Sequence, residues 1–351
     1  MGFNKKFFTT GGIVASASAA LDPLQNFETV TYTGNGSTQS ISSLDFQPDL
    51  VWIKNRDGIY FHGIFDSIRG ANKVISSNNS DIENQHGNWT QQLTSFDSNG
   101  FSLGDNSDSG NYVNVSGDDY VAWCWRAGGT VSANNNTDGD ITSTVSANQD
   151  AGFSIVKYTK SGTTGTIAHG LDSAPEMILE KRTDGAAYWN VRVAGITNNN
   201  QTIYLNQSSG VGTHPSLNLW TTPTDSVFGY NSANATAGDY IAYCFHSVDG
   251  YQKVGSYTGD GTSSGNSIVT GFRPRFVLIK RTDSAGDWRI FDSVRNLSNP
   301  INNFLRPNES AAETTNSSTA SIDFLSNGFE PNSGSASVNA LDANYIYLAI
   351  A

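Results

Sequence analysis

The 351-residue chain contains little charge, and the charge that it has is mostly negative. Charged residues make up 15% of the chain, well below the usual quarter of a globular domain, so solubility rests largely on Asn, Ser and Thr. The net charge of −12 disfavours binding to nucleic-acid phosphates through a general positive field. We therefore expect no nucleic-acid partner.

Long apolar runs and helical periodicity are also scarce. No stretch approaches the roughly 20 apolar residues that span a membrane, so we expect no membrane insertion. Glycine reaches 35 residues against 9 prolines, and Ala and Leu do not recur at helical spacing, which fits many short strands joined by turns. Low charge with 11% aromatic residues is typical of extracellular or virion β-proteins.

Three landmarks recur in the same order in three segments of about a hundred residues, which predicts a repeat architecture. Each segment opens with a Tyr-Thr pair, at Tyr32, Tyr158 and Tyr257. A proline before an apolar run follows, with a lysine six residues later: Pro48 and Lys54, Pro175 and Lys181, Pro274 and Lys280. Each segment closes on an aromatic-rich strand that begins at Tyr120, Tyr240 or Tyr345.

These landmarks divide the chain into an N-terminal arm, three repeats and one linker. The divisions are the docking arm 1–26, repeat 1 at 27–128, a linker at 129–152, repeat 2 at 153–249 and repeat 3 at 250–351. We expect an all-β protein of three tandem antiparallel β-sandwich domains, of jelly-roll or lectin-like type, with an extended N-terminal arm. Because only repeats 2 and 3 lack a linker between them, we expect these two to pack as a close pair and repeat 1 to have more freedom.

The N-terminal arm partly imitates a signal peptide. Lys5 and Lys6 precede a mildly apolar stretch, but Thr9 to Gly12 interrupt the apolar region, which should be continuous in a signal peptide. We therefore interpret residues 1–26 as an arm. Since free chain ends normally fray, such an arm needs a neighbouring subunit or another protein to lie on.

Several local patterns describe single strands and turns. Leu50–Ile53 and Phe276–Ile279 are apolar at every position, which predicts central strands covered on both faces. Asn-Gly pairs at Asn99 and Asn327 predict tight hairpins. The two cysteines hold the same place in repeats 1 and 2, where equivalent positions do not normally meet. We expect Cys124 and Cys244 to be free, buried residues of core strands.

The sharpest polar signature is a Phe-Asp-Ser motif with an arginine three residues after the aspartate. It contains Asp66 and Arg69 in repeat 1 and Asp292 and Arg295 in repeat 3. These side chains are candidate surface or ligand residues, because an acid and an arginine can form half of a sugar-binding or acid–base site. The alternative is a hairpin turn in which the arginine pairs with a carboxylate. Repeat 2 has Val191–Val193 in that region, so the structural interpretation is favoured.

Aromatic residues offer a second kind of candidate. Tyr60 lies in a glycine-containing loop and is the candidate for stacking on a sugar. Trp189 and Trp288 each lie eight residues after the repeat lysine, which indicates a shared structural role.

No pattern identifies a catalytic or metal site. Asp66 with Asp97, and Asp292 with Asp323, could form the carboxylate pairs of a glycosidase, but nothing in the sequence brings them together. The histidines lack metal-ligand spacing, and the calcium-like stretch 134–140 lacks its last acidic ligand because that position is Val145. We expect no catalytic residue, metal or cofactor.

Several stretches of the chain resemble a repeat domain of unknown function that recurs in virion proteins of tailed bacteriophages, especially marine ones. The stretches that carry this resemblance are Phe7–Val14, Pro48–Lys54, Phe65–Arg69, Ser95–Phe101, Tyr120–Gly129 and Asn136–Asn148. Repeat 2 departs at the Phe-Asp-Ser motif, and repeat 3 has Ala349 in the cysteine position. Proteins of this family are tail-fibre or structural components, and no catalytic residues are established for them.

The resemblance implies a non-enzymatic virion structural protein. A tail fibre or appendage that presents β-domains for host-surface adhesion is the first expectation, and a capsid or tail decoration protein is the alternative. A secreted glycan-binding protein or glycosidase is a third. The implied partners are other virion proteins through the N-terminal arm, further copies of the chain, with a trimer favoured, and a host-surface glycan.

Overall fold

The computed structural model describes residues 21–85, 92–105, 112–128, 134–213 and 219–351. Within these ranges the chain is all-β, and its only helical elements are the 3-10 turns η1 (Pro23–Gln25) and η3 (Ser232–Asn234). No helix of the described residues is long and apolar enough to cross a bilayer. The expected all-β class is confirmed, and residues 1–20 of the predicted arm lie outside the described part.

Each repeat contains a main sheet with the same strand order, and none of the sheets formed by the described residues closes into a barrel. The main sheet of repeat 1 has the order β1-β7-β3-β4, from β1 (Phe27–Thr33), β7 (Asp119–Trp125), β3 (Leu50–Asn55) and β4 (Gly63–Asp66). In repeat 3 the order is β18-β24-β20-β21, from β18 (Gln252–Thr258), β24 (Asn344–Ile350), β20 (Phe276–Arg281) and β21 (Arg289–Asp292).

Repeat 2 has the same four central strands with two more at each side. These central strands are β10 (Phe153–Lys160), β17 (Gly238–Phe245), β12 (Met177–Arg182) and β13 (Asn190–Val193). Beyond β13 lie β14 (Gln201–Tyr204) and β15 (Gly212–Thr213), and beyond β10 lie β9 (Ser143–Asn148) and β8 (Asn134–Asn136). Residues of the predicted linker therefore extend the main sheet of repeat 2.

The sequence landmarks mark equivalent places in these sheets. The opening and closing tyrosines face each other across the first two strands and stack in all three repeats, with interplanar angles of 8°, 16° and 11°. Pro48, Pro175 and Pro274 are buried and each lies two residues before its central strand. The landmarks are thus features of the sheet framework.

A smaller sheet covers one face of each main sheet. Its strands are β2 (Gln39–Ile41), β6 (Gly100–Leu103) and β5 (Leu93–Asp97) in repeat 1, β11 (Gly165–Ala168) and β16 (Val227–Tyr230) in repeat 2, and β19 (Ile268–Val269), β23 (Gly328–Pro331) and β22 (Ile322–Leu325) in repeat 3. The predicted hairpins are confirmed, since β5–β6 and β22–β23 turn at the Asn-Gly pairs. A Cβ at Gly100, where φ is 155°, would lie 1.7 Å from the Ile41 carbonyl oxygen, so a side chain cannot fit there.

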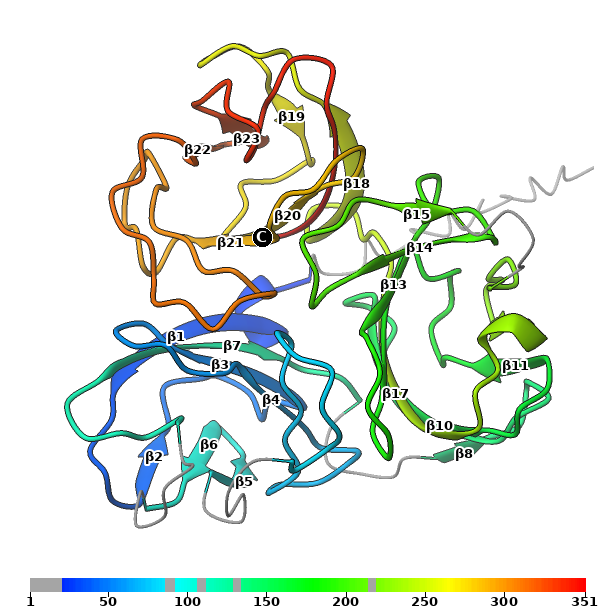
Figure 1. Cartoon of the computed structure of the whole chain (residues 1–351). Coiled ribbons are helices and arrows are strands. Elements are labelled where there is room, and N and C mark those ends of the chain that lie inside the picture. The colour runs from blue at the N-terminus through cyan, green and yellow to red at the C-terminus, as the bar shows by residue number, and fades with distance from the viewer. Residues whose placement is uncertain (1–20, 86–91, 106–111, 129–133, 214–218) are drawn as a thin grey trace, which may run out of the picture.

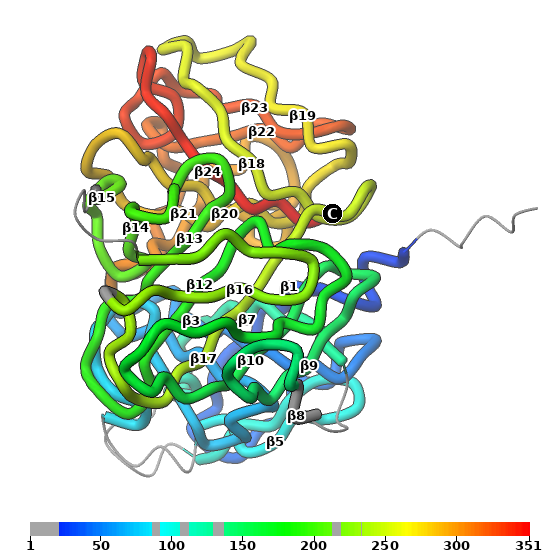
Figure 2. Tube along the Cα trace, turned by 90° about the vertical axis from the view of Figure 1, so that its right-hand side faces the viewer, coloured from blue at the N-terminus to red at the C-terminus, as the bar shows by residue number. Residues whose placement is uncertain are grey.

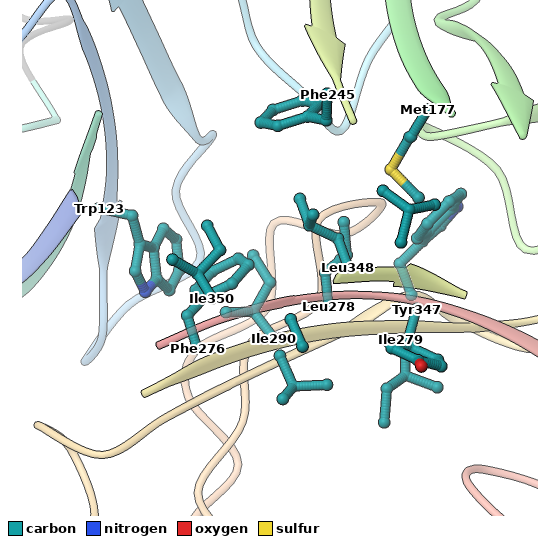
Figure 3. Packing of buried hydrophobic residues seen from close by; sticks show 14 of the residues in the cluster. Trp123, Met177, Phe245, Phe276, Leu278, Ile279, Ile290, Tyr347, Leu348 and Ile350 are labelled. Carbon is teal, nitrogen blue, oxygen red and sulfur yellow. The ribbon is translucent and has the colours of Figure 1, made fainter. Parts of the chain in front are cut away.

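The opposite face of every main sheet packs into one core that all three repeats share. In β3 the even positions Leu50 and Trp52 belong to this shared core, whereas Val51 and Ile53 belong to a separate core under the smaller sheet. This explains why the central strands are apolar at every position. Figure 3 shows Trp123 of repeat 1, Phe245 of repeat 2 and Phe276 of repeat 3 converging on the shared core.

The three repeats surround the shared core as a closed ring, which Figure 1 shows from one side. Eleven side chains from all three repeats line a residual apolar cavity of only about 10 Å³ between them, so the centre of the ring is filled and is not a channel. The expectation that repeat 1 has more freedom is wrong, because repeat 1 packs against both of the other repeats. The free, buried state predicted for Cys124 and Cys244 is confirmed.

Candidate functional site

The most elaborate polar sites of the molecule lie where one repeat meets the next. At each interface a loop of one repeat donates a backbone N–H to the carbonyl two residues after the lysine of the following repeat. Glu83 N–H binds Thr183 at the 1–2 interface, Val211 N–H binds Thr282 at the 2–3 interface and Glu313 N–H binds Arg56 at the 3–1 interface, with N–O distances of 2.7–2.9 Å. The same contact made three times head to tail closes the ring.

The 1–2 interface contains the Asp66–Arg69 pair predicted from the sequence. Arg69 Nε lies 2.5 Å from Asp66 Oδ2, and the two side chains are 2% and 0% exposed. Arg69 also reaches Glu83 Oε2 at 3.2 Å, and Tyr243 of repeat 2 donates its hydroxyl to Asp66 at 2.8 Å. The acid, the arginine and the tyrosine therefore satisfy one another inside the interface.

The 3–1 interface has the same construction. Arg295 Nε lies 2.6 Å from Asp292 Oδ2 and its Nη1 lies 2.6 Å from Glu313 Oε1, with all three side chains at most 3% exposed. The donor from the neighbouring repeat is here Trp123, whose Nε1 lies 3.0 Å from Asp292. Arg56 of repeat 1 adds a second cation to Glu313 at 2.8 Å.

These distances support the favoured structural interpretation of the motif, in which the arginine pairs with a carboxylate, over the role of surface or ligand residues. The side chains of Asp66, Arg69, Asp292 and Arg295 are at most 2% exposed and pair inside the interfaces, so they are not the surface residues that were expected. A buried arginine requires carboxylate partners. Burial of the motif at two interfaces between repeats therefore explains why the acid and the arginine occur together.

The 2–3 interface replaces the whole charged set with apolar residues. The strand registers place Val193 at the position of Asp66 and Asp292, and three residues later Ile196 stands in the place of the arginines. Val211 occupies the position of the two glutamates, and Leu348 occupies the position of the donors Tyr243 and Trp123. All four positions of the polar set, namely the aspartate, the arginine, the glutamate and the hydrogen-bond donor, are thus apolar at the 2–3 interface. No member of the set is left there as an unpaired charge.

The charges of the polar interfaces fix the ionisation of the groups in them. Burial alone lowers the pKa of Arg69, but Asp66, Tyr243 and Glu83 outweigh it, so the pKa is raised and the guanidinium stays charged. The pKa of Arg295 is raised in the same way by Asp292 and Glu313. Burial and the Asp66 carboxylate together raise the pKa of Tyr243 well above its usual value, so its hydroxyl remains a donor.

The three repeat lysines are buried beside these interfaces. Lys181 Nζ donates to the Ser80 carbonyl of repeat 1, at 3.3 Å, and Lys280 Nζ donates to the Ser208 carbonyl of repeat 2, at 2.9 Å. Lys54 binds carbonyls of its own loop, including Asn55 at 2.6 Å. Burial lowers the pKa of Lys54 to about 7 and the pKa values of Lys181 and Lys280 to about 8.

The buried lysines predict how stability changes with pH. Their folded pKa values lie below the unfolded value of about 10.4, so the unfolded chain binds more protons above about pH 7 and stability rises with pH. We expect Tm to increase between pH 7 and 8.5, and this slope to flatten in the triple variant K54M/K181M/K280M. Above about pH 8.5 the raised pKa values of Cys124 and Cys244 oppose this increase, because the unfolded thiols lose their protons first. A Tm that falls from pH 7 to 8.5 would contradict the account.

The position eight residues after each lysine also contacts the preceding repeat. Trp189 Nε1 donates to the Ser76 carbonyl at 2.8 Å, and Trp288 Nε1 donates to the Tyr204 carbonyl at 2.9 Å. Repeat 1 has His62 there, and its Nε2 contacts the Arg306 carbonyl at 3.0 Å. The shared structural role predicted for Trp189 and Trp288 is confirmed, and His62 performs it in the third interface.

The interior of repeat 2 contains a charged cluster that the sequence analysis missed. Lys160 Nζ lies 2.9 Å from Glu180 Oε1, both side chains are fully buried, and Tyr158 donates its hydroxyl to the same carboxylate. The lysine also lies 4.3 Å and 4.2 Å from the ring centroids of Tyr230 and Tyr240. A glutamate within the apolar run Pro175–Lys181, where repeats 1 and 3 have isoleucine, was the signal.

The remaining candidates have ordinary structural surroundings. Tyr60 is half-buried and packs against the separate core of repeat 1. Asp97 accepts bonds from Ser95 and Ser102 in the β5–β6 hairpin, away from the buried Asp66, and Asp323 pairs with Asn332. Within the described ranges no three His, Cys, Asp or Glu side chains gather as metal ligands. His86 and His214 lie outside those ranges.

An open pocket of about 400 Å³ lies on the outer side of the 1–2 interface. It is lined by Arg69, Lys73, Ile82, Glu83, Lys157, Thr183, Asp184 and Asp239. Cations and carboxylates on the same wall can donate and accept hydrogen bonds but do not give the pocket a single charge. Such a lining suits a neutral polyhydroxyl ligand better than an anion.

Comparisons with known proteins define the family but not its activity. The described fold is an all-β ring of repeats held by buried interfaces. The chain matches the family model of a domain of unknown function, DUF7483, over residues 22–351, and it therefore belongs to that family. No curated protein and no solved structure matches the chain.

Proposed function

We propose that this chain is a non-enzymatic structural protein of a bacteriophage virion, built as three tandem β-sandwich domains with an N-terminal docking arm. Its role is that of a tail fibre or appendage that presents β-domains for host-surface adhesion. Residues 1–26 dock on other virion proteins. The particle is the protein's site of action.

One observation carries this proposal together with the resemblance of the sequence. The charged residues that recur between repeats form buried ion pairs at the interfaces that hold the repeats together. They are Asp66 and Arg69 in repeat 1 and Asp292 and Arg295 in repeat 3. The recurring features therefore support a rigid, closed scaffold and supply no convergent set of accessible reactive groups. The loops that differ between repeats remain for recognition.

A capsid or tail decoration protein is the second candidate, and a specific arrangement favours it. The C-terminus and η1 lie on the same side of the ring, whereas β14 and β15 lie on the opposite side (Figure 2). One side would thus attach the molecule while the other faces outward. A secreted glycan-binding protein or glycosidase is the third candidate. The polar pocket at the 1–2 interface is the observation that supports it.

Imaging of intact particles tests the proposal. Antibody or tag labelling should locate the chain on purified virions, at the tail for the fibre role and on a lattice for the decoration role. Absence of the chain from purified particles would sink both virion candidates.

Glycan binding is tested separately at the pocket. We expect a ligand from the host surface to bind there with an affinity that falls at least tenfold in the double variant K157A/D239A. The exposed substitution L297A serves as the matched control, since Leu297 is 91% exposed in another repeat. Equal binding by both variants on a glycan array would exclude this pocket as the adhesion site.

A further inference from the structure

Repeat 2 contains a buried arginine without a counter-charge. Arg192 lies on β13 and is 6% exposed, and no described residue forms an ion pair or a hydrogen bond with it. Its Nε is sealed from solvent without a partner. Because Nη1 and Nη2 are not sealed in this way, the end of the guanidinium faces an opening. Burial alone acts on the pKa of Arg192 and lowers it, so no carboxylate of the described chain compensates the charge.

The two other arginines that are similarly buried have partners. Arg295 pairs with Asp292 and Glu313. Arg289 donates to the Asp287 carbonyl at 3.0 Å. A buried guanidinium that lacks such partners destabilises the folded chain, because the loss of its hydration is not compensated. The arginine of β13 therefore costs stability unless a group from outside the described chain pairs with it.

The fold does not require an arginine at this place. The strand registers put Phe65 of repeat 1 and Phe291 of repeat 3 at the position of Arg192. Both phenylalanines are fully buried. A charged residue that costs stability in one repeat, where the other two have phenylalanine, has the character of a functional residue.

Arg192 lies in a row of side chains on the face of β13 that turns away from the shared core. Its two neighbours in the strand belong to that core, so strand alternation places Arg192 on the same face as Asn190. Tyr204 of β14 lies opposite Asn190. The ring of Tyr188, two residues before Asn190, lies 5.1 Å from the Tyr204 ring, measured between centroids. Tyr188, Asn190, Arg192 and Tyr204 together form the β13 row.

The β13 row opens to solvent at Tyr188. This side chain is 51% exposed, and it is the only exposed aromatic residue in the described ranges. The other exposed large apolar residues of the described chain belong to repeats 1 and 3. An aromatic ring without exposed apolar neighbours lacks the surroundings of a protein–protein hot spot, but its face can pack against the C–H groups of a sugar ring.

The middle of the β13 row can bind sugar hydroxyls. Asn190 Nδ2 donates to Glu180 at 3.2 Å, and no described residue bonds to its Oδ1. The hydroxyls of Tyr188 and Tyr204 likewise have no partner among the described residues. From Tyr188 to Arg192 the chain advances four residues, which span at most about 14 Å. Stacking, hydrogen-bonding and charged groups thus follow one another within the length of a short oligosaccharide.

We propose that the β13 row binds an acidic oligosaccharide, with a sugar ring packed on Tyr188 and a carboxylate held by Arg192. A carboxylate supplies the counter-charge that Arg192 lacks, and its two oxygens match two N–H groups of the planar guanidinium. The adjoining strand β14 lies on the side of the ring opposite the C-terminus and η1 (Figure 2). The inference rests on the proposed adhesion to a host-surface glycan, and it names the chemical class of that glycan.

Arg192→Phe tests the charged contact in the full-length chain, because phenylalanine is the residue of the other two repeats. By isothermal titration calorimetry, we expect the wild type to bind oligosaccharides of galacturonate or of glucuronate at least tenfold more tightly than their uncharged methyl esters. R192F should lose this preference, and Y188A should weaken the binding of acid and ester alike. L297A, an exposed substitution in repeat 3, is the control and should bind as the wild type does.

The Tm without ligand provides a second readout. R192F should be at least as stable as the wild type, since it removes an unpaired buried charge. The proposal is overturned if neither acid binds more tightly than its ester, or if R192F keeps the preference. It is also overturned if acetate competes as well as the acidic oligosaccharide, because Arg192 would then bind a free carboxylate ion only. Because purified protein is used, a failure here leaves the particle-imaging test of the virion role unaffected.

Discussion

Replacement of Arg69 by isoleucine is expected to lower the free energy of unfolding by about 3–5 kcal/mol. The substitution leaves the Asp66 carboxylate buried at 0% exposure with Tyr243 as its remaining side-chain donor. A buried charge without its counter-charge is among the largest single costs in a folded protein. Urea unfolding monitored by tryptophan fluorescence measures the change.

The 2–3 interface supplies the matched rescue for this variant. The quadruple variant D66V/R69I/E83V/Y243F removes all four members of the polar set at the 1–2 interface. It installs there the apolar residues that Val193, Ile196 and Val211 provide at the 2–3 interface. We expect it to recover most of the lost stability, since well-packed apolar groups can replace a buried ion cluster at little or no cost. A loss below 1 kcal/mol for R69I, or a quadruple variant no more stable than R69I, would refute this account of the interfaces.

Replacement of Phe276 by alanine is the second change with a large expected effect, again about 3–5 kcal/mol. The Phe276 ring lies 5.3 Å from Phe27, 6.2 Å from Trp123 and 5.8 Å from Trp125, measured between centroids. It therefore fills the shared core where repeat 3 meets repeat 1 (Figure 3). The loss should spread across the interface and raise hydrogen exchange in β1 and β7 as well as in β20.

Phe101→Ala provides the control for Phe276→Ala. Phe101 is equally buried but belongs to the separate core of repeat 1, so its loss should raise exchange in repeat 1 alone. Hydrogen exchange with mass spectrometry distinguishes the two patterns. Confinement of the F276A effect to repeat 3 would show that the repeats do not share a core.

The framework of the fold was predictable because it follows from local patterns. Period-two alternation, apolar runs after Pro48 and Pro274, and the Asn-Gly pairs all act within one or two strands, so the sequence displays them directly. The count of repeats and the order of their landmarks needed no tertiary information. The apolar character of Leu50–Ile53 correctly indicated a strand covered on both faces.

The arrangement of the repeats was not predictable, because it depends on contacts between residues far apart in the chain. Linker length is a poor guide here, since a long connection between repeats 1 and 2 says nothing about how their sheets pack. The pairing of Arg69 with a carboxylate was the favoured interpretation of the motif, but sequence spacing cannot show that Tyr243, more than a hundred residues later, completes the pair.

Comparison of the repeat sequences indicates the buried sites only in part. The loss of the Phe-Asp-Ser motif from repeat 2 is visible in the sequence, but the coupled change at Val211 and Leu348 becomes visible only once strand registers identify the equivalent positions. The role of Glu180 could not be predicted from its own segment, because its partner Lys160 lies 20 residues earlier on another strand. A charge at a position that is isoleucine in the sister repeats is the signal of a buried pair.

The central claim is that three repeats form one cooperative ring around a shared core. Differential scanning calorimetry of the full chain tests it most directly, by comparing calorimetric and van't Hoff enthalpies of unfolding. We predict a single transition with equal enthalpies, shifted as a whole to lower temperature by R69I. Two or three separate transitions, with R69I moving only one of them, would contradict the claim.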